Sequence, residues 1–213
     1  MKTKTRMHTD TLPDVQQKLL KLLALQPWLS PFYLAGGTGL ALQICHRQSV
    51  DFDFFTPSAF STRAIREQLR SLGTFELYSE ADHTIDGALN GVKMSFMEYN
   101  YPQLCAHQSH QRLNVASMLD IALMKLGAIS GRGTRKDFVD LYAILRDKPL
   151  LKDYFDMLPR KYGASRINTY HILKSLTYFD DAETEPPLRM LVPFDWQECK
   201  AFFVREAHAI IMP

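Results

Sequence analysis

The chain has 213 residues, 46% of them hydrophobic and 23% charged, and its 25 Lys and Arg residues against 23 Asp and Glu leave a formal net charge of +2. This composition excludes a disordered, collagen-like or coiled-coil protein, and the near-neutral charge excludes a basic coat for indiscriminate nucleic-acid binding. The three cysteines form no CxxC pair, which favours neither a disulfide framework nor a zinc cage. No apolar run reaches the ~18 residues of a membrane helix, and the opening MKTKTRMHTD lacks a signal-peptide core, so we expect a cytoplasmic protein with no membrane partner.

The first half of the chain is predicted to mix helices and strands. Leucines spaced three and four apart over residues 11–29 indicate an amphipathic helix that ends at Pro27. Residues 32–35 are a short apolar run that meets a glycine pair and continues as a helical stripe, which is typical of a strand, a turn and a helix. A glycine pair at the start of a helix allows close backbone approach, and the free N–H groups there favour an anion such as phosphate.

The next segment, SVDFDFF over residues 49–55, alternates polar and apolar side chains with the period of a strand. The polar face would carry Ser49, Asp51 and Asp53, and the buried apolar face Val50, Phe52 and Phe54. Two carboxylates on one face repel each other unless they hold a hard cation, and Mg²⁺ typically takes one or two carboxylates together with substrate phosphates. A phosphate-binding turn beside metal-binding carboxylates predicts nucleotidyl transfer, although the same residues also fit a plain turn and an exposed strand face.

Two further signals complete the first half. Ser61 or Thr62 is expected to cap a helix over 61–72 that stops at Gly73. The Asn90-Gly91 pair then predicts a tight turn between two strands of a hairpin.

From residue 114 onward the helical period dominates, so we place a boundary near 115. The expected domains are an α/β domain over 12–115 and a helical domain over 116–213. Helices are expected over 117–130, 134–146, 149–158, 164–179 and 195–210. The predicted fold class is therefore α+β, a small mixed sheet flanked by helices and followed by a helical domain.

Two blocks of sequence, YLAGGTGLALQICHRQSVDFDFF and MLDIALMKLGAISGRGTRKDFVDLYAIL, resemble the AbiEii/AbiGii-type nucleotidyltransferase toxins of the DNA polymerase beta-like superfamily, over roughly residues 30–145. The resemblance implies a polymerase beta-like domain, a Gly-Gly-Ser/Thr turn that binds a triphosphate, a DxD pair that carries Mg²⁺, and a downstream Lys and Asp that complete the site. Carried over, these residues are Gly36, Gly37 and Thr38 for the triphosphate, Asp51 and Asp53 for the metal, and Lys125 with Asp137 or Asp140. The helical domain is expected to complete the active-site cleft.

The residues of the second block support this assignment in part. Lys125 lies on a mostly apolar helix surface, so its ammonium needs an anion or a path to water. Asp137 has a structural explanation as an acid in the first turn of a helix, so we favour Asp140 as the catalytic aspartate and keep Asp137 as the alternative. The block departs from a strict RxKD pattern, and either Arg132 or Arg135 takes the place of its arginine.

A few residues outside the two blocks' motifs are further candidates. Ser49 shares the acidic face and Lys93 lies on the hairpin strand, so both are assigned to the nucleotide, whereas Glu98 falls at that strand's end. The HxxH of His107 and His110 fits a loop better than a metal site. Four tyrosines could stack on bases, as aromatic side chains do in single-strand binding proteins; these are Tyr99, Tyr101, Tyr162 and Tyr170.

The function predicted from these features is a Mg²⁺-dependent nucleotidyltransferase that transfers a nucleoside monophosphate from an NTP to a hydroxyl. The resemblance implies an RNA acceptor, such as the 3′ end of a tRNA, and a toxin restrained by a separate antitoxin protein in a bacterial toxin–antitoxin or abortive-infection system. Two alternatives stay open. One is a nucleotidyltransferase that modifies a small hydroxylated molecule, and the other is an inactive module of the same fold that binds a nucleotide or a partner protein.

Overall fold

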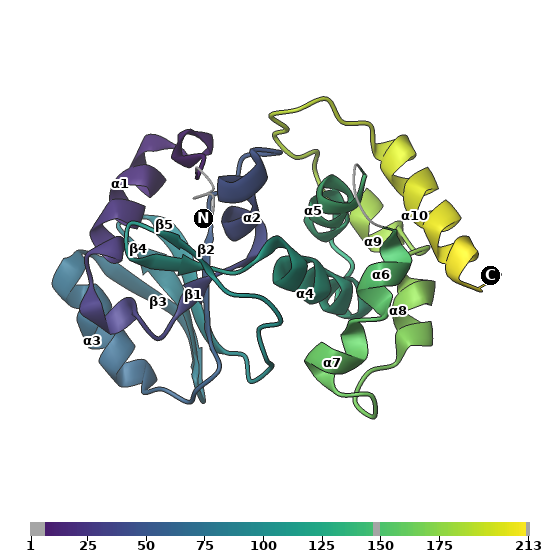
Figure 1. Ribbon diagram of the computed structural model, residues 1–213. Coiled ribbons are helices and arrows are strands. Elements are labelled where there is room, and N and C mark those ends of the chain that lie inside the picture. The colour runs from purple at the N-terminus through teal and green to yellow at the C-terminus, as the bar shows by residue number, and fades with distance from the viewer. Residues whose placement is uncertain (1–6, 147–149, 212–213) are drawn as a thin grey trace, which may run out of the picture. The chain divides into compact units, whose positions relative to one another are not determined.

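A computed structural model describes residues 7–146 and 150–211 of the chain. The chain folds as two compact units, Met1–Pro102 with Ala106–Ser117, and Gln103–Cys105 with Met118–Pro213. The first unit combines a mixed sheet with helices and the second is helical, which confirms the predicted fold class (Figure 1).

The first unit is built on a seven-stranded sheet with strand order β3-β4-β5-β2-β1-β7-β6. The strands are β1 (Tyr33–Leu34), β2 (Phe52–Thr56), β3 (Phe75–Ala81), β4 (Thr84–Leu89), β5 (Val92–Glu98), β6 (Gln108–His110) and β7 (Leu113–Val115). Strand β2 pairs in parallel with β5 and antiparallel with β1, so it lies at the centre of the sheet.

One face of this sheet forms the hydrophobic core with two helices, α1 (Asp14–Ala24) and α3 (Thr62–Leu72), which lie beside the sheet in Figure 1. The rings of Phe54 and Phe96 stack at 4.9 Å on that face, and both side chains are fully buried. Burying a side chain of this size contributes roughly 1.5–3 kcal/mol. The first helix is shorter than the leucine pattern predicts, because α1 ends at Ala24 and the 3₁₀ helices η1 (Thr9–Thr11) and η2 (Pro27–Leu29) flank it.

Strand β2 begins at Phe52, so the prediction of a strand over 49–55 is wrong at its start. Asp51 precedes the strand, and Val50 is 43% exposed instead of buried. The physical reason is a bond from another element: the Thr38 hydroxyl donates to the Asp51 carbonyl at 2.5 Å. This segment is therefore tied to a helix and not to a neighbouring strand.

Two local predictions in the first unit are confirmed. The Ser61 side chain caps α3 by accepting a hydrogen bond from the Ala64 N–H at 3.3 Å, and Gly73 follows the last turn. Asn90 and Gly91 turn the chain from β4 to β5 with φ angles of 52° and 79°, in the left-handed region that this dipeptide favours.

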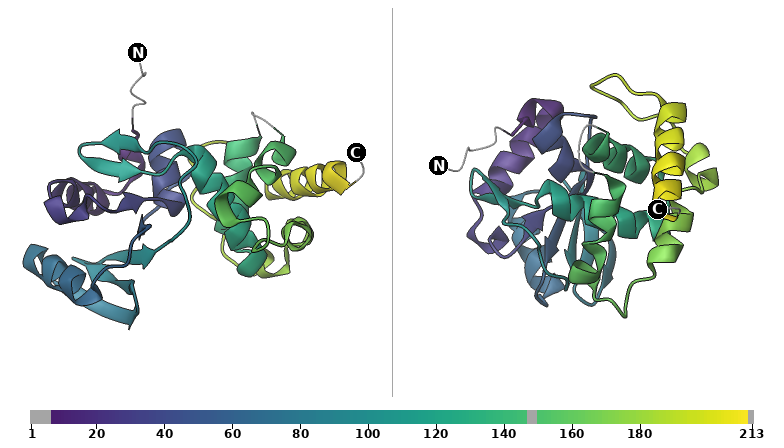
Figure 2. Two further views of the ribbon diagram at one scale, coloured as in Figure 1. Left: turned by 60° about the horizontal axis from the view of Figure 1, so that its bottom comes forward. Right: turned by 45° about the vertical axis from the view of Figure 1, so that its right-hand side comes forward.

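The second unit consists of helices around a core of aromatic rings. The helices are α4 (Met118–Gly131), α5 (Arg135–Leu145), α6 (Leu151–Phe155), α7 (Leu158–Tyr162), α8 (Thr169–Ser175), α9 (Asp180–Glu183) and α10 (Trp196–Ile211). Phe138 of α5 is fully buried and contacts the rings of Phe179, Trp196 and Phe203. Helix α10 packs against α5 and α6 (Figure 2).

The helices predicted between residues 149 and 179 differ from those observed. The predicted helix over 149–158 starts at a position outside the described residues, and its remainder is split between α6 and α7. The predicted helix over 164–179 is limited to α8, because Gly163 leaves the helical region with φ 84° and Asn168 caps α8 by accepting from the His171 N–H. No helix in the described ranges is long and apolar enough to cross a membrane.

Candidate active site

Gly36 and Gly37 open helix α2 (Gly36–Ile44), and each lies against a charged side chain. A Cβ atom on Gly36 would lie 2.6 Å from Asp53 Oδ2, and a Cβ atom on Gly37 would overlap the guanidinium of Arg47. Gly36 also has a φ of +61°, which L side chains rarely adopt. The glycine pair is therefore explained by the close approach of a carboxylate and a guanidinium to the backbone. We call Gly36 and Gly37 with Asp53 and Arg47 the glycine turn.

The glycine turn places a guanidinium beside the N-terminus of a helix. The first N–H groups of an α-helix have no acceptor within the helix and lie at the positive end of its dipole. Arg47 is only 5% exposed, and its Nη1 donates to the Gln48 carbonyl at 3.0 Å. A buried guanidinium beside a helix N-terminus creates a local environment that favours an anion such as phosphate.

Arg47 is the residue that the sequence analysis missed at this turn. It lies inside the block that carries the resemblance, between the glycine pair and the two aspartates. Its position in the block could have marked this basic residue as a candidate. Its close contact with Gly37 is visible only in the folded structure.

The side chains of Thr38 and Ser49 hold the turn in place. Both are buried, and their hydroxyl groups are hydrogen-bonded to each other at 2.8 Å. Because Thr38 also donates to the Asp51 carbonyl, the first turn of α2 is fixed to the segment that enters β2. The geometry gives these two hydroxyl groups a positioning role beside the predicted triphosphate site.

The sheet register shows which residues lie beside Asp53. Asp53 pairs with Ser95 of β5, so a serine occupies the neighbouring-strand position at which a polymerase beta-like site often has a third carboxylate. Glu98 pairs with Thr56, three residues further along. Lys93 is exposed and lies two residues before Ser95, and therefore on the same face.

A polar row continues from Ser95 across the sheet, and the sequence analysis missed its outer members. Asp86 of β4 pairs with Ser95, and its Oδ2 accepts a hydrogen bond from Ser79 of β3 at 2.7 Å. The register between strands depends on how they pair in the folded protein. The sequence of a single strand therefore does not show that these polar side chains are neighbours.

Asp51 and Asp53 are the carboxylates that fit a divalent metal. Asp53 lies against the glycine turn, and Asp51 is half-buried directly before β2. Within residues 7–146 and 150–211, no three His, Cys, Asp or Glu side chains group closely enough to hold a metal ion on their own. Mg²⁺ needs only one or two carboxylates when substrate phosphates supply further oxygens, so these residues fit a metal that is bound together with a triphosphate.

The second unit contains the other predicted residues, which form a buried ion cluster. Lys125 Nζ lies 2.8 Å from Asp137 Oδ1 and 2.6 Å from Asp140 Oδ2. Asp137 also accepts hydrogen bonds from Thr134 and from Arg132 Nε, the latter at 3.0 Å. Both aspartates are completely buried and Lys125 is 5% exposed. We call Lys125, Asp137 and Asp140 the lysine cluster.

The pKa values in the lysine cluster show that the charges stabilise one another. Burial alone would raise the pKa of Asp137, but the ammonium of Lys125 and the guanidinium of Arg132 outweigh it and lower the pKa to about 2. Burial alone would lower the pKa of Lys125, but the carboxylates of Asp140 and Asp137 raise it. Lys125 and Asp137 are therefore both ionised at neutral pH.

The two arginines left open by the sequence have different surroundings. Arg132 contacts Asp137, and its side chain is 60% exposed. Arg135 donates from Nε to the Ala182 carbonyl at 2.9 Å, and its guanidinium lies 4.9 Å from the centre of the Trp196 ring. Arg132 thus lies beside Asp137, while the contacts of Arg135 link α5 to α9 and α10.

A second buried ion pair in this unit was not predicted. Lys161 Nζ donates to Asp120 Oδ1 at 2.8 Å, and both side chains are completely buried. The carboxylate of Asp120 also accepts the backbone N–H groups of Leu104 and Cys105, at 2.9 and 3.1 Å. The sequence gives no signal for this pair, because Lys161 lies 41 residues from Asp120 along the chain.

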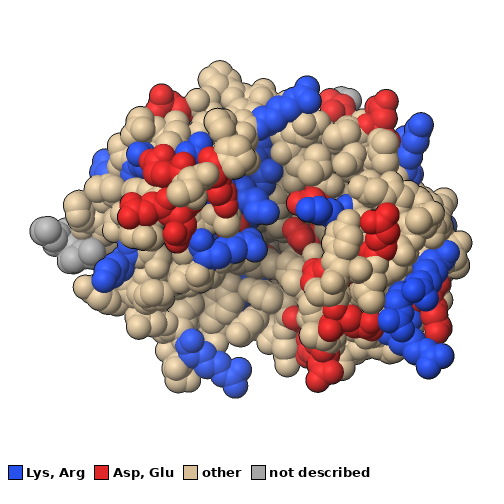
Figure 3. Space-filling model, turned by 180° about the vertical axis from the view of Figure 1, so that it is seen from behind, with Lys and Arg blue, Asp and Glu red and all other residues tan. Residues whose placement is uncertain are grey.

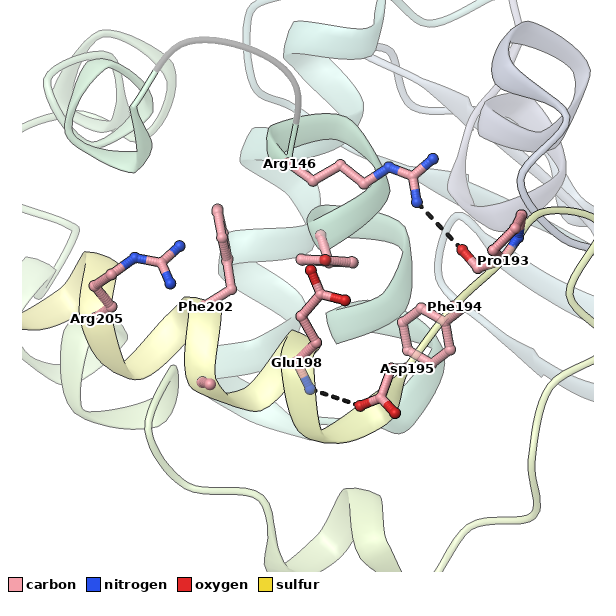
Figure 4. Close-up of a pocket in the computed structure, with 9 residues that line it drawn as sticks. Arg146, Pro193, Phe194, Asp195, Glu198, Phe202 and Arg205 are labelled. Carbon is pink, nitrogen blue, oxygen red and sulfur yellow. Dashed lines mark hydrogen bonds between the residues drawn. The ribbon is translucent and has the colours of Figure 1, made fainter.

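The second unit also has a pocket of about 640 Å³ beside α5 and α10 (Figure 4). Its lining residues are Tyr142, Arg146, Pro193, Phe194, Asp195, Glu198, Ala201, Phe202 and Arg205. Burial and the neighbouring carboxylate of Glu198 raise the pKa of Tyr142 to about 12, so its hydroxyl stays protonated. Two arginines and two acids balance each other here, which gives the pocket no preference for a polyanion.

Basic and acidic side chains are interspersed over the face shown in Figure 3, and neither sign forms a continuous surface there. This agrees with the formal net charge of +2.

Comparison with known proteins places this geometry in a family. The model of the family described as "Nucleotidyl transferase AbiEii toxin, Type IV TA system" matches residues 18–209. An uncharacterised protein of Aquifex aeolicus (strain VF5) is 38% identical over 180 residues, which cover 82% of this chain and 85% of the relative. Among solved structures, MenT4, a nucleotidyltransferase toxin from Mycobacterium tuberculosis, is similar with a TM-score of 0.57 and 14% identity, over 94% of this chain and 86% of that one.

Proposed function

This chain belongs to the AbiEii family of nucleotidyltransferase toxins, and from that premise we propose that it transfers a nucleoside monophosphate from an NTP to a hydroxyl group of an RNA. The observation that supports the proposal most directly is the glycine turn, where one glycine lies against the Asp53 carboxylate and the next against the buried Arg47 guanidinium. A group that binds phosphate and a carboxylate that binds a metal thus contact consecutive residues, which is the juxtaposition that nucleotidyl transfer needs.

In the proposed reaction, the N–H groups of Gly36, Gly37 and Thr38 and the guanidinium of Arg47 hold the triphosphate. Mg²⁺, bound by Asp51 and Asp53, would supply electrostatic stabilisation of the phosphate oxygens. A bond forms between the acceptor oxygen and the α-phosphorus, the bond from that phosphorus to the bridging oxygen breaks, and pyrophosphate leaves. One of the two aspartates accepts the proton of the acceptor hydroxyl.

The catalytic roles of Lys125, Asp140 and Asp137 remain part of the proposal. These side chains are paired with one another within the second unit, so their effect on the reaction must be separated from their effect on folding. Arg132, Arg135 and Lys93 are likewise proposed as nucleotide contacts, with Arg132 favoured over Arg135 because its side chain is the more exposed.

The biological setting is also proposed from the family. We infer that the protein is the toxin of a toxin–antitoxin or abortive-infection system, acts in the cytoplasm where NTPs and RNA are present, and is restrained by a cognate antitoxin protein. The proposed acceptor is RNA, such as the 3′ end of a tRNA.

The experiment that tests the function is incubation of the protein with labelled NTPs, Mg²⁺ and total RNA. We expect label in RNA with the wild type and none with Asp53→Asn, while Asp82→Asn, an exposed aspartate in the turn between β3 and β4, keeps wild-type transfer. Label in small molecules alone would favour the metabolite-modifying alternative. No label in any fraction, with intact nucleotide binding, would favour an inactive binding module.

A further inference from the structure

Aromatic side chains continue along the face of the sheet that carries Asp53. Phe55 follows Asp53 by two residues on β2, so it lies on the same face about 7 Å further along. Its ring meets the ring of Tyr99 edge-on at 5.6 Å, and Tyr99 meets Tyr101 at 4.9 Å. All three side chains are half-buried. We call Phe55, Tyr99 and Tyr101 the aromatic row.

The aromatic row is packed against neighbouring residues on β1 and β2. Phe55 stacks at 5.9 Å on Tyr33, which is 1% exposed and stacks in turn on His107 at 4.8 Å. The Tyr99 N–H donates to the Thr56 carbonyl at 2.7 Å, which continues the pairing of β5 with β2 one residue beyond the end of β5. Rings that are fixed in this way lose little conformational freedom when a flat ligand stacks on them.

The aromatic row and the two glycines of the glycine turn lie on opposite sides of Asp53 along β2. Strand β1 runs antiparallel to β2, and the Ala35 N–H donates to the Asp53 carbonyl immediately before α2 begins. The glycine turn is therefore beside the first residues of β2. Phe55 and Tyr99 lie toward the last residues and beyond them.

This order along β2 has a chemical consequence, which rests on the proposed function. In phosphoryl-group transfer the attacking and leaving oxygens lie roughly in line on opposite sides of the phosphorus. If pyrophosphate leaves toward the glycine turn, the acceptor hydroxyl approaches from the side of the aromatic row. We propose that the aromatic row binds the terminal bases of a single-stranded RNA acceptor and so positions its hydroxyl for attack.

An oligonucleotide fits the row better than a small hydroxylated molecule does. Three successive rings offer stacking surface for more than one base, and stacking tolerates any base because every base has a flat π face. A small polar molecule would contact only the part of the row next to Asp53.

The test uses the full-length protein, labelled NTP and a short single-stranded RNA, and compares Phe55→Leu, Tyr99→Leu and Tyr101→Leu with the wild type. We expect the KM for RNA to rise about tenfold in Tyr99→Leu, in line with the loss of one stacked base, while the KM for NTP is unchanged. Tyr99→Phe, which keeps the ring, should restore the wild-type value. Tyr78→Leu is the matched control, because Tyr78 is an exposed ring on β3 (56%) outside the row.

A second readout is fluorescence anisotropy of a labelled six-nucleotide RNA with the Asp53→Asn variant, in which transfer is blocked. The double variant with Tyr99→Leu should bind this RNA about tenfold more weakly. An unchanged RNA KM and unchanged RNA binding, in a protein that still labels RNA, would overturn the inference and leave the proposed function standing. A raised KM for NTP alone would assign the row to the incoming base and would equally overturn it. If the wild type fails to label RNA, both the proposed function and the inference about the aromatic row are wrong.

Discussion

The glycine turn of the first unit and the lysine cluster of the second both bring charged side chains together, but the surroundings of those charges differ. At the glycine turn, a carboxylate and a guanidinium press against backbone that carries no side chain, and the helix N-terminus adds unsatisfied donors. In the lysine cluster, one ammonium satisfies two completely buried carboxylates. The first arrangement places its charges against backbone at the start of a helix, whereas the second pairs its charges with one another inside a helical unit.

A sequence motif does not distinguish residues that act on a substrate from residues that keep a buried charge paired. If the proposed function is right, substitutions at the glycine turn should change activity more than stability, because this function assigns the turn's charges to the triphosphate and the metal. Substitutions in the lysine cluster should change stability first, because a buried charge that loses its partner is costly. The predictions below test this separation, beginning with the largest expected effect.

The substitution Lys125→Met should be the most destabilising. It leaves Asp137 and Asp140 buried without their ammonium, and removal of one partner from a buried ion pair costs about 3–5 kcal/mol. The measurement is urea unfolding followed by circular dichroism. Lys152→Met, an exposed lysine on α6, is the matched control and should stay within about 0.5 kcal/mol of the wild type. A loss of activity with no loss of stability in Lys125→Met would contradict the separation and assign the ammonium to the substrate.

The substitution Gly36→Ala should reduce nucleotidyl transfer by about a hundredfold and destabilise the protein by about 2 kcal/mol. The methyl group meets Asp53 Oδ2 at 2.6 Å, so the carboxylate must move, and a displacement of about 1 Å at a reacting centre costs that much in rate.

Gly91→Ala is the control for the backbone strain in this experiment. Its φ of +79° carries the same kind of penalty, about 1 kcal/mol, but no atom lies within 4 Å of the added methyl group. Equal losses of activity in the two variants would show that strain, and not the carboxylate, is responsible.

The lysine cluster also predicts a pH dependence of unfolding. The pKa of Asp137 is about 2 in the folded protein and 3.8 without these contacts, so the folded state holds the carboxylate charged where the unfolded state binds a proton. Asp137 therefore contributes about 2 kcal/mol to the free energy of unfolding above pH 4, and this contribution is lost as the pH falls toward 2. The slope of unfolding free energy against pH in this window should be smaller in Asp137→Asn and unchanged in Asp153→Asn, an exposed residue of α6. Identical slopes in all three proteins would contradict the assignment.

The smallest effect is expected where the two arginines are compared. Arg135→Gln loses the bond to the Ala182 carbonyl and the contact with Trp196, and should cost about 1–2 kcal/mol. Arg132→Gln loses an ion pair in which the arginine side chain is 60% exposed and the carboxylate of Asp137 keeps its bond to Lys125, so it should cost about 1 kcal/mol or less in thermal or urea unfolding. If Arg132→Gln nevertheless weakens NTP binding, it is the arginine of the motif that meets the substrate. If Arg132→Gln is instead less stable than Arg135→Gln, the contact of Arg132 with Asp137 stabilises the fold more than the contacts of Arg135 do.

The sequence predicted the elements whose signals are local. The helical period over 117–130 and 134–146 matches α4 and α5 within two residues, and the Asn90-Gly91 turn lies where its dipeptide indicates. These patterns depend on neighbours a few positions apart, which the sequence displays directly.

The features that escaped prediction depend on contacts between distant segments. The start of β2 is set by Thr38, thirteen residues before Asp51, and the position beside Asp53 is filled by Ser95 because of strand register. The burial of Arg47 against Gly37 depends on the same folding of α2 onto β2. Lys161 finds Asp120 forty-one residues away, so neither residue could be recognised as half of a pair.

The short segment Gln103–Cys105 gives the chain an unusual path, since it is counted with the second unit although both of its flanks belong to the first. The carboxylate of Asp120 receives two of its backbone N–H groups. A fragment that starts at residue 118 would therefore lack part of its own hydrogen bonding, at a cost of about 1–3 kcal/mol for each polar group left unsatisfied. Exchange of helical modules between members of this family, by recombination or by design, has to carry this three-residue segment along with the helices. A single crossover point in the gene cannot deliver an intact module.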